Sequence, residues 1–294
     1  MLNTRSYYDL NIMDTCFSDE NQRKTLELLY KFGYRTIAVN QMVEDSNMEI
    51  KRKKKKGEPR DFIDCVPNPI DISKLNQISN ELGFKDFTIL NRLTVIFSNQ
   101  DNLHKILKSP NYKKYHIVAS LPTSTAAFMF TCSNFDADIL TIDPQNKTNI
   151  KLNRKLYNQL IEKGCHFELL YSPAIEDSTK RKNLIYTSHL YHSIGKSKNV
   201  IFSSGAQDSM LLRSPYDVIS LGFIFGLGEL QCKASISHCP QRVVINSVGR
   251  IHGKSVMFIE NTQNERDISL ITLSSSDSEE EEMDTKPVQK KCKQ

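Results

Sequence analysis

The sequence predicts an α/β fold, a (β/α) barrel of parallel strands. Eight short apolar runs recur within about 250 residues, and segments of helical character separate them. Eight alternations of strand and helix are the number that closes a barrel of this kind. Runs such as TIAV and LTVIF are almost wholly apolar, which is typical of strands covered on both faces. No G-x-G-x-x-G loop follows any run, which argues against the alternative, a doubly wound open sheet.

The expected strands are spaced so that one helix fits between each pair. Their residues favour extended backbone, because β-branched and aromatic side chains fit a pleated surface. The strands are expected at 7–12, 36–40, 93–97, 116–120, 138–142, 166–171, 199–203 and 242–246.

Three of the intervening segments carry clear helix signals. Two of them place leucines on one face and end at a glycine, Gly33 or Gly164, which can take the left-handed conformation that stops a helix. The third begins with Ser214 as N-cap and Pro215 in the first turn. These helices are expected at 20–33, 153–164 and 214–228.

The apolar runs end in small polar residues. In a barrel the ends of parallel strands converge on the C-terminal mouth, where functional sites are built. Serine, asparagine and aspartate are also ordinary helix caps, so the ring of them is a better candidate than any one member. The ring comprises Asn40, Ser98, Asn99, Ser120, Asp143, Ser172, Ser203, Ser204, Asn246 and Ser247.

The net charge of +5 is unevenly distributed. The run KRKKKK at 51–56 supplies six positive charges, and the segment from Ser274 to the end has six acidic residues against four lysines. The rest of the chain is therefore close to neutral, and any contact with a polyanion must use local patches.

Composition also excludes several protein classes. No apolar run reaches the roughly 18 residues needed to span a bilayer, and the first residues lack the apolar core of a signal peptide. The seven cysteines are scattered without a C-x-x-C pair, which favours reduced thiols in the cytosol or nucleus over a disulfide framework or a zinc ribbon.

Catalytic constellations are missing from the predicted mouth, so neither a catalytic residue nor a cofactor is expected. His116 and His166 stand at strand starts, His189 and His192 have no acidic residue between them, and the first strand, YDLNIM, has no His-x-His pair. Ser172 is followed by proline and lies in no G-x-S-x-G motif. Paired carboxylates for glycosidase chemistry are also absent from the strand ends.

Anion binding is better supported. In SPAIEDSTKRKN, Asp177 or Ser178 can cap a helix whose first turns are basic, and helix amides with nearby cations form a phosphate-sized site. Asp177 would itself occupy the cap, so a phosphate would have to use the basic side chains. The alternative is that these cations pair with nearby carboxylates. The candidate contacts are Lys180, Arg181, Lys182, Arg213, Arg92, Ser203 and Ser204.

Two segments lie outside the expected barrel. A basic loop at about 44–62 contains Lys51, Arg52, Lys53, Lys54, Lys55 and Lys56, which is typical of a nuclear localisation signal, a nucleic-acid contact, or both. We expect a disordered tail at 263–294 after a barrel domain at 1–262, because serines and charges dominate the tail. Ser274, Ser276 and Ser278 each precede an acidic residue by three positions, which suits an acid-directed kinase.

Several stretches carry a family resemblance. ELLYSPAIEDSTKR, KNVIFSSGAQ, LRSPYDVISLGFIFGL and ILNRLTVIFS closely resemble the thirty-kilodalton protein subunit of eukaryotic and archaeal ribonuclease P, shared in eukaryotes with ribonuclease MRP. YYDLNI and GYRTIAVNQMV fit the same family, so that the likeness runs from about residue 6 to about residue 260.

The resemblance implies a barrel of the polymerase-and-histidinol-phosphatase superfamily, in which DLNIM stands where metal-dependent members have D-x-H-x-H. It also implies a non-catalytic subunit that binds ribonuclease P RNA and ribonuclease MRP RNA through the basic groups above. The resemblance further implies that RNA is the catalyst and that precursor tRNA is the substrate of the holoenzyme. The role would be the processing of tRNA and rRNA in the nucleus and nucleolus. A small subunit with a split ferredoxin-like fold would be one protein partner. Two alternatives stay open, a metal-dependent phosphoesterase or nuclease acting alone and an interaction hub that binds only proteins.

Overall fold

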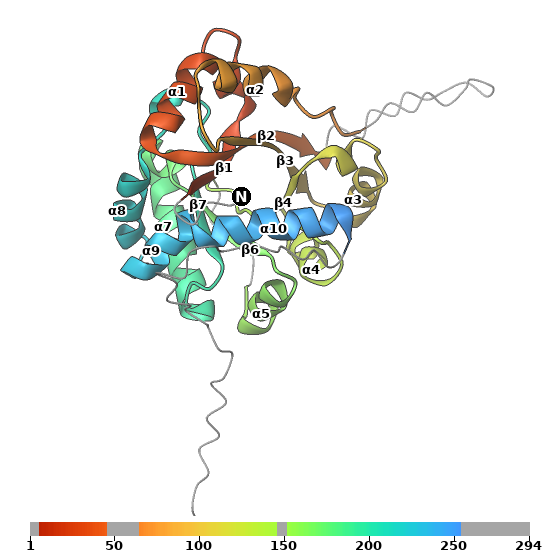
Figure 1. The fold of residues 1–294 in the computed structure, drawn as a ribbon. Helices are drawn as coiled ribbons and strands as arrows, with labels where there is room; N and C mark the ends of the chain where they lie inside the picture. The colour runs from red at the N-terminus through yellow and green to blue at the C-terminus, as the bar shows by residue number, and fades with distance from the viewer. Residues whose placement is uncertain (1–5, 46–64, 146–151, 254–294) are drawn as a thin grey trace, which may run out of the picture. The chain divides into compact units, whose positions relative to one another are not determined.

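The computed structural model describes residues 6–45, 65–145 and 152–253. In these ranges seven parallel strands stand in chain order around a barrel (Figure 1). β1 meets β7 through hydrogen bonds from the Gly205 amide to the Asn11 carbonyl (2.7 Å) and from the Met13 amide to the Ala206 carbonyl (2.9 Å), so the ring is nearly closed. The strands are β1 (Tyr7–Met13), β2 (Tyr34–Glu44), β3 (Thr88–Phe97), β4 (Ile117–Pro122), β5 (Ile139–Leu140), β6 (His166–Leu170) and β7 (Val200–Ser203).

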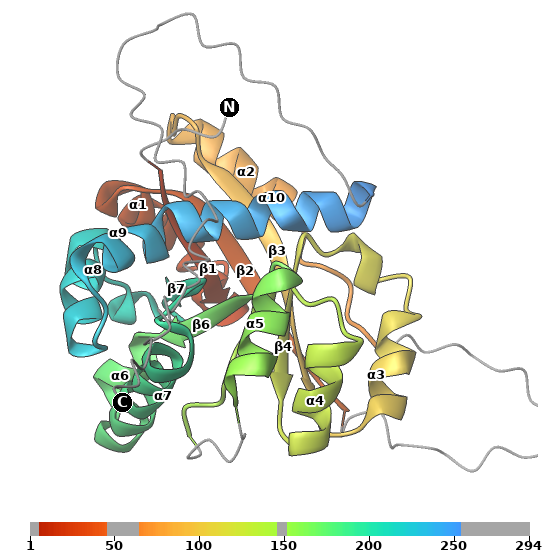
Figure 2. The same ribbon diagram turned by 90° about the horizontal axis from the view of Figure 1, so that it is seen from below.

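Helices surround the ring, and the last one, α10, crosses the N-terminal end of the barrel (Figure 2). Asn246 of α10 donates to the Gly164 carbonyl, and Arg250 bonds Asp138 and the His116 carbonyl, which all lie just before strands. The helices are α1 (Gln22–Phe32), α2 (Ile72–Glu81), α3 (Gln100–Leu107), α4 (Thr125–Ser133), α5 (Arg154–Glu162), α6 (Ser172–Glu176), α7 (Ser178–Gly195), α8 (Pro215–Ile224), α9 (Glu229–Ile236) and α10 (His238–His252), with short 3₁₀ turns η1 (Asp14–Phe17), η3 (Tyr112–Lys114) and η4 (Ser209–Leu211).

The expectation of an eighth strand at 242–246 is wrong, because these residues lie inside α10. The buried positions of this helix are Pro240, Val243 and Ser247, which is helical spacing. Val243 is fully buried and packs with Tyr8 in the core cluster at the barrel floor. The run RVVIN has the composition of a strand, but β1 and β7 already meet, so no strand edge remains for it to pair with.

The other seven strands and the three predicted helices are confirmed, with shifted ends. β3 begins at Thr88 rather than at 93, which places Arg92 inside the strand. Gly33 has the left-handed φ of +101° that ends α1, and the side chain of Ser214 accepts the Asp217 amide at the start of α8.

Two expectations drawn from composition can be compared with the described residues. The six cysteines of the described residues are all free thiols. Within the same ranges, no helix combines the length and the apolar character that crossing a membrane requires.

The barrel interior has an apolar floor and a polar upper layer. Side chains alternate along a strand, so every second residue points inward. Along β2, β5 and β7 the inward positions change towards the mouth from Ala38, Ile139 and Ile201 to Asn40, Thr141 (the residue that follows β5) and Ser203. The floor comprises Tyr8, Leu10, Ala38, Ile117, Ala119, Ile139, Ile201 and Val243.

Candidate functional site

A buried ion pair occupies the centre of the polar layer. Nη1 of Arg92 (β3) lies 2.5 Å from Oε1 of Glu168 (β6), and Nη2 lies 2.7 Å from Oε2. Both side chains are 0% exposed. The remaining guanidinium donors reach the Leu10 carbonyl (2.9 Å), Thr141 Oγ1 (3.2 Å) and Thr94 Oγ1 (3.3 Å). Every donor direction of the guanidinium is therefore used inside the barrel.

A chain of neutral side chains completes the network around this pair. Thr94 donates to Asn40 Oδ1 (2.8 Å), Asn40 donates to Asn11 Oδ1 (2.9 Å), and Asn11 donates to Glu168 (3.3 Å). The register of β1 against β2 shifts between Asp9 and Ile12, and Asn11 lies within that irregularity. Thr141 also donates to Glu168. The network joins five strands around one buried carboxylate.

The pKa values of the two buried carboxyl groups in the polar layer are shifted in opposite directions. Burial alone would raise the pKa of Glu168, but the Arg92 charge and hydrogen bonds hold that pKa below its ordinary value, so the pair is ionised. Burial raises the pKa of Asp9 to about 6, against the lowering effect of the Ser204 and Asn11 amides that donate to Oδ1. Asp9 Oδ2 has no hydrogen-bond partner among the described residues.

The donor set does not fit a metal ion. Asp9, Asn11 and Met13 occupy the three positions of the D-x-H-x-H pattern, and neither an amide nor a thioether replaces imidazole as a ligand for zinc or manganese. The Arg92 guanidinium already holds both oxygens of Glu168. Across the described ranges, no three His, Cys, Asp or Glu side chains gather where they could hold an ion.

Three of the residues predicted to contact an anion lie in the barrel interior, and the prediction of a surface contact is wrong for them. Arg92 has no exposed surface, and Glu168 neutralises its charge. Ser203 and Ser204 are buried, and the Ser204 hydroxyl donates to the Asn11 carbonyl (2.8 Å). These side chains offer no surface to a phosphate outside the barrel.

The basic residues at the start of α7 lie on the surface. Of the two expected caps, Asp177 and Ser178, it is Asp177 that caps the helix, by accepting the Thr179 and Lys180 amides. Lys180 Nζ lies 3.8 Å from Glu176, at the upper limit for an ion pair, and Lys182 is exposed. Both ammonium groups lie near the C-terminal mouth, where β6 passes into α6 and α7.

The two arginines of the same region are held by backbone carbonyls. Arg181 donates from Nε to the Ala174 carbonyl (2.6 Å) and from Nη2 to the Ile175 carbonyl (3.4 Å) at the end of α6. Arg213 donates from Nη1 to the carbonyls of Met210 and Leu212. Their positions are fixed, but among the described residues neither arginine has a carboxylate within ion-pair distance.

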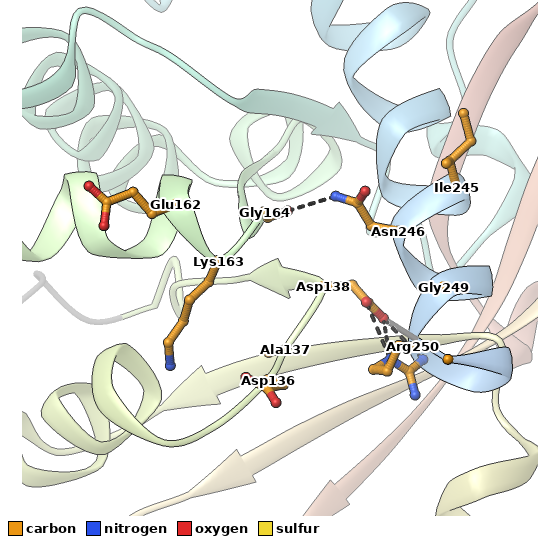
Figure 3. Close-up of a pocket in the computed structure, with 11 residues that line it drawn as sticks. Asp136, Ala137, Asp138, Glu162, Lys163, Gly164, Ile245, Asn246, Gly249 and Arg250 are labelled. Carbon is orange, nitrogen blue, oxygen red and sulfur yellow. Dashed lines mark hydrogen bonds and ion pairs between the residues drawn. The ribbon is translucent and has the colours of Figure 1, made fainter. Parts of the chain in front are cut away.

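A pocket of about 870 Å³ lies at the opposite, N-terminal end, between α5 and α10 (Figure 3). Figure 3 shows Arg250 turned towards Asp138 and Asn246 bonded to Gly164. Lys163, also on the wall, donates to the Ser133 carbonyl (2.8 Å). Arg250 and Asn246 thus hold α10 on the barrel, while Lys163 is engaged with the end of α4.

Glu168, the buried acidic partner of Arg92, was not among the residues predicted from the sequence. The available signal was a lone glutamate inside the apolar run HFELL and a lone arginine inside NRLTVIF. A charge inside each of two buried strands suggests a partner of opposite sign.

The chain is similar in sequence to proteins of a known family. A family model described as RNase P subunit p30 matches residues 6–252. The chain belongs to the RNase P subunit p30 family. Its match with Ribonuclease P protein subunit p30 of Mus musculus has 33% identity over 218 residues, covering 73% of this chain and 76% of the mouse protein.

Two further comparisons concern the family and the fold, respectively. Ribonuclease P/MRP protein subunit RPP1 of Saccharomyces cerevisiae is 27% identical over 239 residues, which cover 80% of this chain and 74% of the yeast protein. A chain in the cryo-EM structure of archaeal Ribonuclease P with mature tRNA superposes with a TM-score of 0.61 at 13% identity, covering 88% of this chain and all of that chain. At 13% identity the similarity between the two chains shows a shared fold, which agrees with the predicted α/β barrel.

Proposed function

We propose that this p30 family chain is a non-catalytic protein subunit of ribonuclease P and of ribonuclease MRP. The family match over residues 6–252 carries the proposal, since it spans the whole described barrel. In the holoenzyme the RNA subunit cleaves the 5′ leader of precursor tRNA, and the MRP particle processes rRNA. The barrel supports both particles by binding RNA and other protein subunits, including a small subunit with a split ferredoxin-like fold.

A stand-alone metal-dependent phosphoesterase or nuclease is the less favoured alternative. Such an enzyme needs convergent ligands at the mouth, and the Arg92–Glu168 pair with Asn11 and Met13 is a poor donor set for one. Purification of the tagged full chain from cells separates the two functions. We expect ribonuclease P RNA and precursor tRNA cleavage in the purified particle, whereas cleavage by the chain after removal of RNA would contradict the proposal.

We propose that Lys180, Lys182 and Arg213 contact RNA phosphates at the C-terminal mouth. These side chains lie on or near the surface, while Arg92, Ser203 and Ser204 are buried, and Arg181 is bound against α6. Contacts of this kind release counterions, so that affinity falls steeply with salt.

Lys180→Ala combined with Lys182→Ala should weaken RNA binding and flatten its salt dependence. The slope of log affinity against log salt should fall by about one unit for each phosphate contact removed. Filter binding of the chain to ribonuclease P RNA over a salt series measures both effects. The matched control is Lys24→Ala with Lys31→Ala, an equal charge change on exposed positions of α1. Equal losses for the two pairs would show that only net charge matters.

The predictions for the basic run at 51–56 and for the tail concern residues outside the described ranges. We propose that residues 51–56 direct nuclear import, with the nucleolus as the site of the complex, and that Ser274, Ser276 and Ser278 are phosphorylated. Deletion of 51–56 should move the chain to the cytoplasm while its affinity for the RNA stays unchanged, as measured by fluorescence microscopy and filter binding. Retained nuclear localisation with lost RNA affinity would assign the loop to binding instead. The barrel limits at 1–262, with the insertion at 44–62, and the tail at 263–294 remain predictions.

A further inference from the structure

An apolar pocket of about 310 Å³ opens between α6, α7 and α8 near the mouth of the barrel. Its aliphatic wall comes from Ile175 of α6, Ile185 of α7, and Leu221 and Ile224 of α8. Ile185 stands four residues after Arg181, so both lie on the same face of α7, and Arg181 also lines the pocket. The polar network around Arg92 uses none of the pocket residues named here.

One residue of the pocket lining is largely exposed, and two further exposed apolar residues are adjacent in sequence to lining residues. Ile224 is 58% exposed although it lines the pocket, and Phe223 beside it on α8 is 54% exposed. Tyr186, next to Ile185 on α7, is 47% exposed. Neighbouring exposed apolar groups around a concave site are typical of a surface that another macromolecule covers.

One positive charge lies at the edge of the pocket. The Arg181 side chain is oriented by the carbonyls of Ala174 and Ile175, and no described carboxylate lies within ion-pair distance of it. Lys182, the next residue, is exposed. A carboxylate placed beside an apolar anchor would meet Arg181 with the charge-assisted geometry that arginine forms best.

The lining favours protein over RNA as the occupant. An unstacked base is bound by flat aromatic faces and by polar groups that read its edges. Tyr171 and Phe225 also line the pocket, but they are only 1% and 2% exposed, so neither offers an open flat face on which a base could stack. The accessible wall is branched aliphatic surface from Ile175, Ile185, Leu221 and Ile224, which suits an aliphatic or aromatic side chain.

We propose that the pocket between α6, α7 and α8 is a docking site for another protein subunit of the same particle. The partner inserts one large apolar side chain between Ile185 and Ile224 and places an aspartate or glutamate near it on Arg181. This inference rests on the proposed function, because it assigns one of the protein contacts of that complex.

Site-specific crosslinking tests the identity of the occupant. Tyr186 is replaced by p-benzoylphenylalanine in the tagged full chain, the cells are irradiated, and the particle is purified through its RNA subunit. We expect the crosslinked peptide to come from a different protein of the particle and to hold a large apolar residue within a few positions of Asp or Glu. A crosslink to RNA, to a second copy of this chain or to nothing would overturn the proposal.

A substitution tests the pocket itself. Ile224→Asp should reduce the co-purified amount of that same subunit by about tenfold or more, the effect of losing an anchor contact at the centre of an interface. Met129→Asp on α4, where Met129 is 49% exposed, is the matched control and should retain the subunit. Equal recovery with Ile224→Asp and Met129→Asp would overturn the proposal. If the unsubstituted chain lacks ribonuclease P RNA, the proposed function fails first, so the two failures are distinguishable.

Discussion

Glu168→Gln should lower the free energy of unfolding by about 3–5 kcal/mol, because it leaves the Arg92 charge buried without a counterion. The carboxylate accepts hydrogen bonds from Arg92, Thr141 and Asn11, and glutamine offers one neutral oxygen in place of two charged ones. Urea unfolding followed by circular dichroism measures the loss.

A double substitution separates the interaction from the cost of burial. Arg92→Met with Glu168→Leu removes both charges and should recover most of the stability lost in either single variant, since apolar replacements of a buried pair are often nearly neutral. Since each single loss is about 3–5 kcal/mol and the loss in the double variant is small, the double-mutant cycle should yield a coupling energy above about 3 kcal/mol, the upper end of the usual range for residues in direct contact. Lys233→Ala, which breaks an exposed pair on α9, is the control and should leave stability nearly unchanged. Additive single losses would contradict a specific pair at the barrel centre.

The stability of the Asp9→Asn variant, compared with that of the wild type at the same pH, should increase as the pH rises. Burial raises the pKa of Asp9 to about 6 in the folded state, from an ordinary value near 4. The folded chain thus holds a proton that the unfolded chain has released between about pH 4 and pH 6, so wild-type stability falls as the pH rises through this window.

The size of this effect follows from the same shift. The free energy of unfolding of Asp9→Asn minus that of the wild type should increase by about 3 kcal/mol between pH 4 and pH 7.5, since two pKa units correspond to about that energy. Urea titrations across the pH range measure the difference. Asp19→Asn, in an exposed turn, is the control. A difference that stays constant with pH would show that Asp9 ionises as an ordinary surface carboxyl does.

Both predictions concern a barrel whose interior is occupied by its own side chains. The Arg92–Glu168 pair and the Asn11–Asn40–Thr94 chain use the space where a barrel enzyme places its reacting groups. Functional contacts of the p30 family chain are therefore to be sought on its outer surfaces, which include the basic start of α7 and the pocket beside α8.

The fold class, the positions of seven strands and the ends of several helices could be predicted from the amino-acid sequence. These features depend on residues a few positions apart: the apolar runs, Gly33 at the end of α1, Asp177 at the start of α7, and Ser214 with Pro215 at the start of α8. The segments that resemble the p30 family also lie within the matched range.

The conformation of 242–246 and the surroundings of the charged residues depend on contacts between distant parts of the chain. The run RVVIN becomes part of α10 because β1 and β7 meet and leave it no strand to pair with. Arg92 is an interior residue because ring closure brings it to Glu168, 76 positions away in the chain. A local pattern records the propensity of a segment, whereas the partner of a buried charge depends on which distant strands the closed barrel places opposite one another.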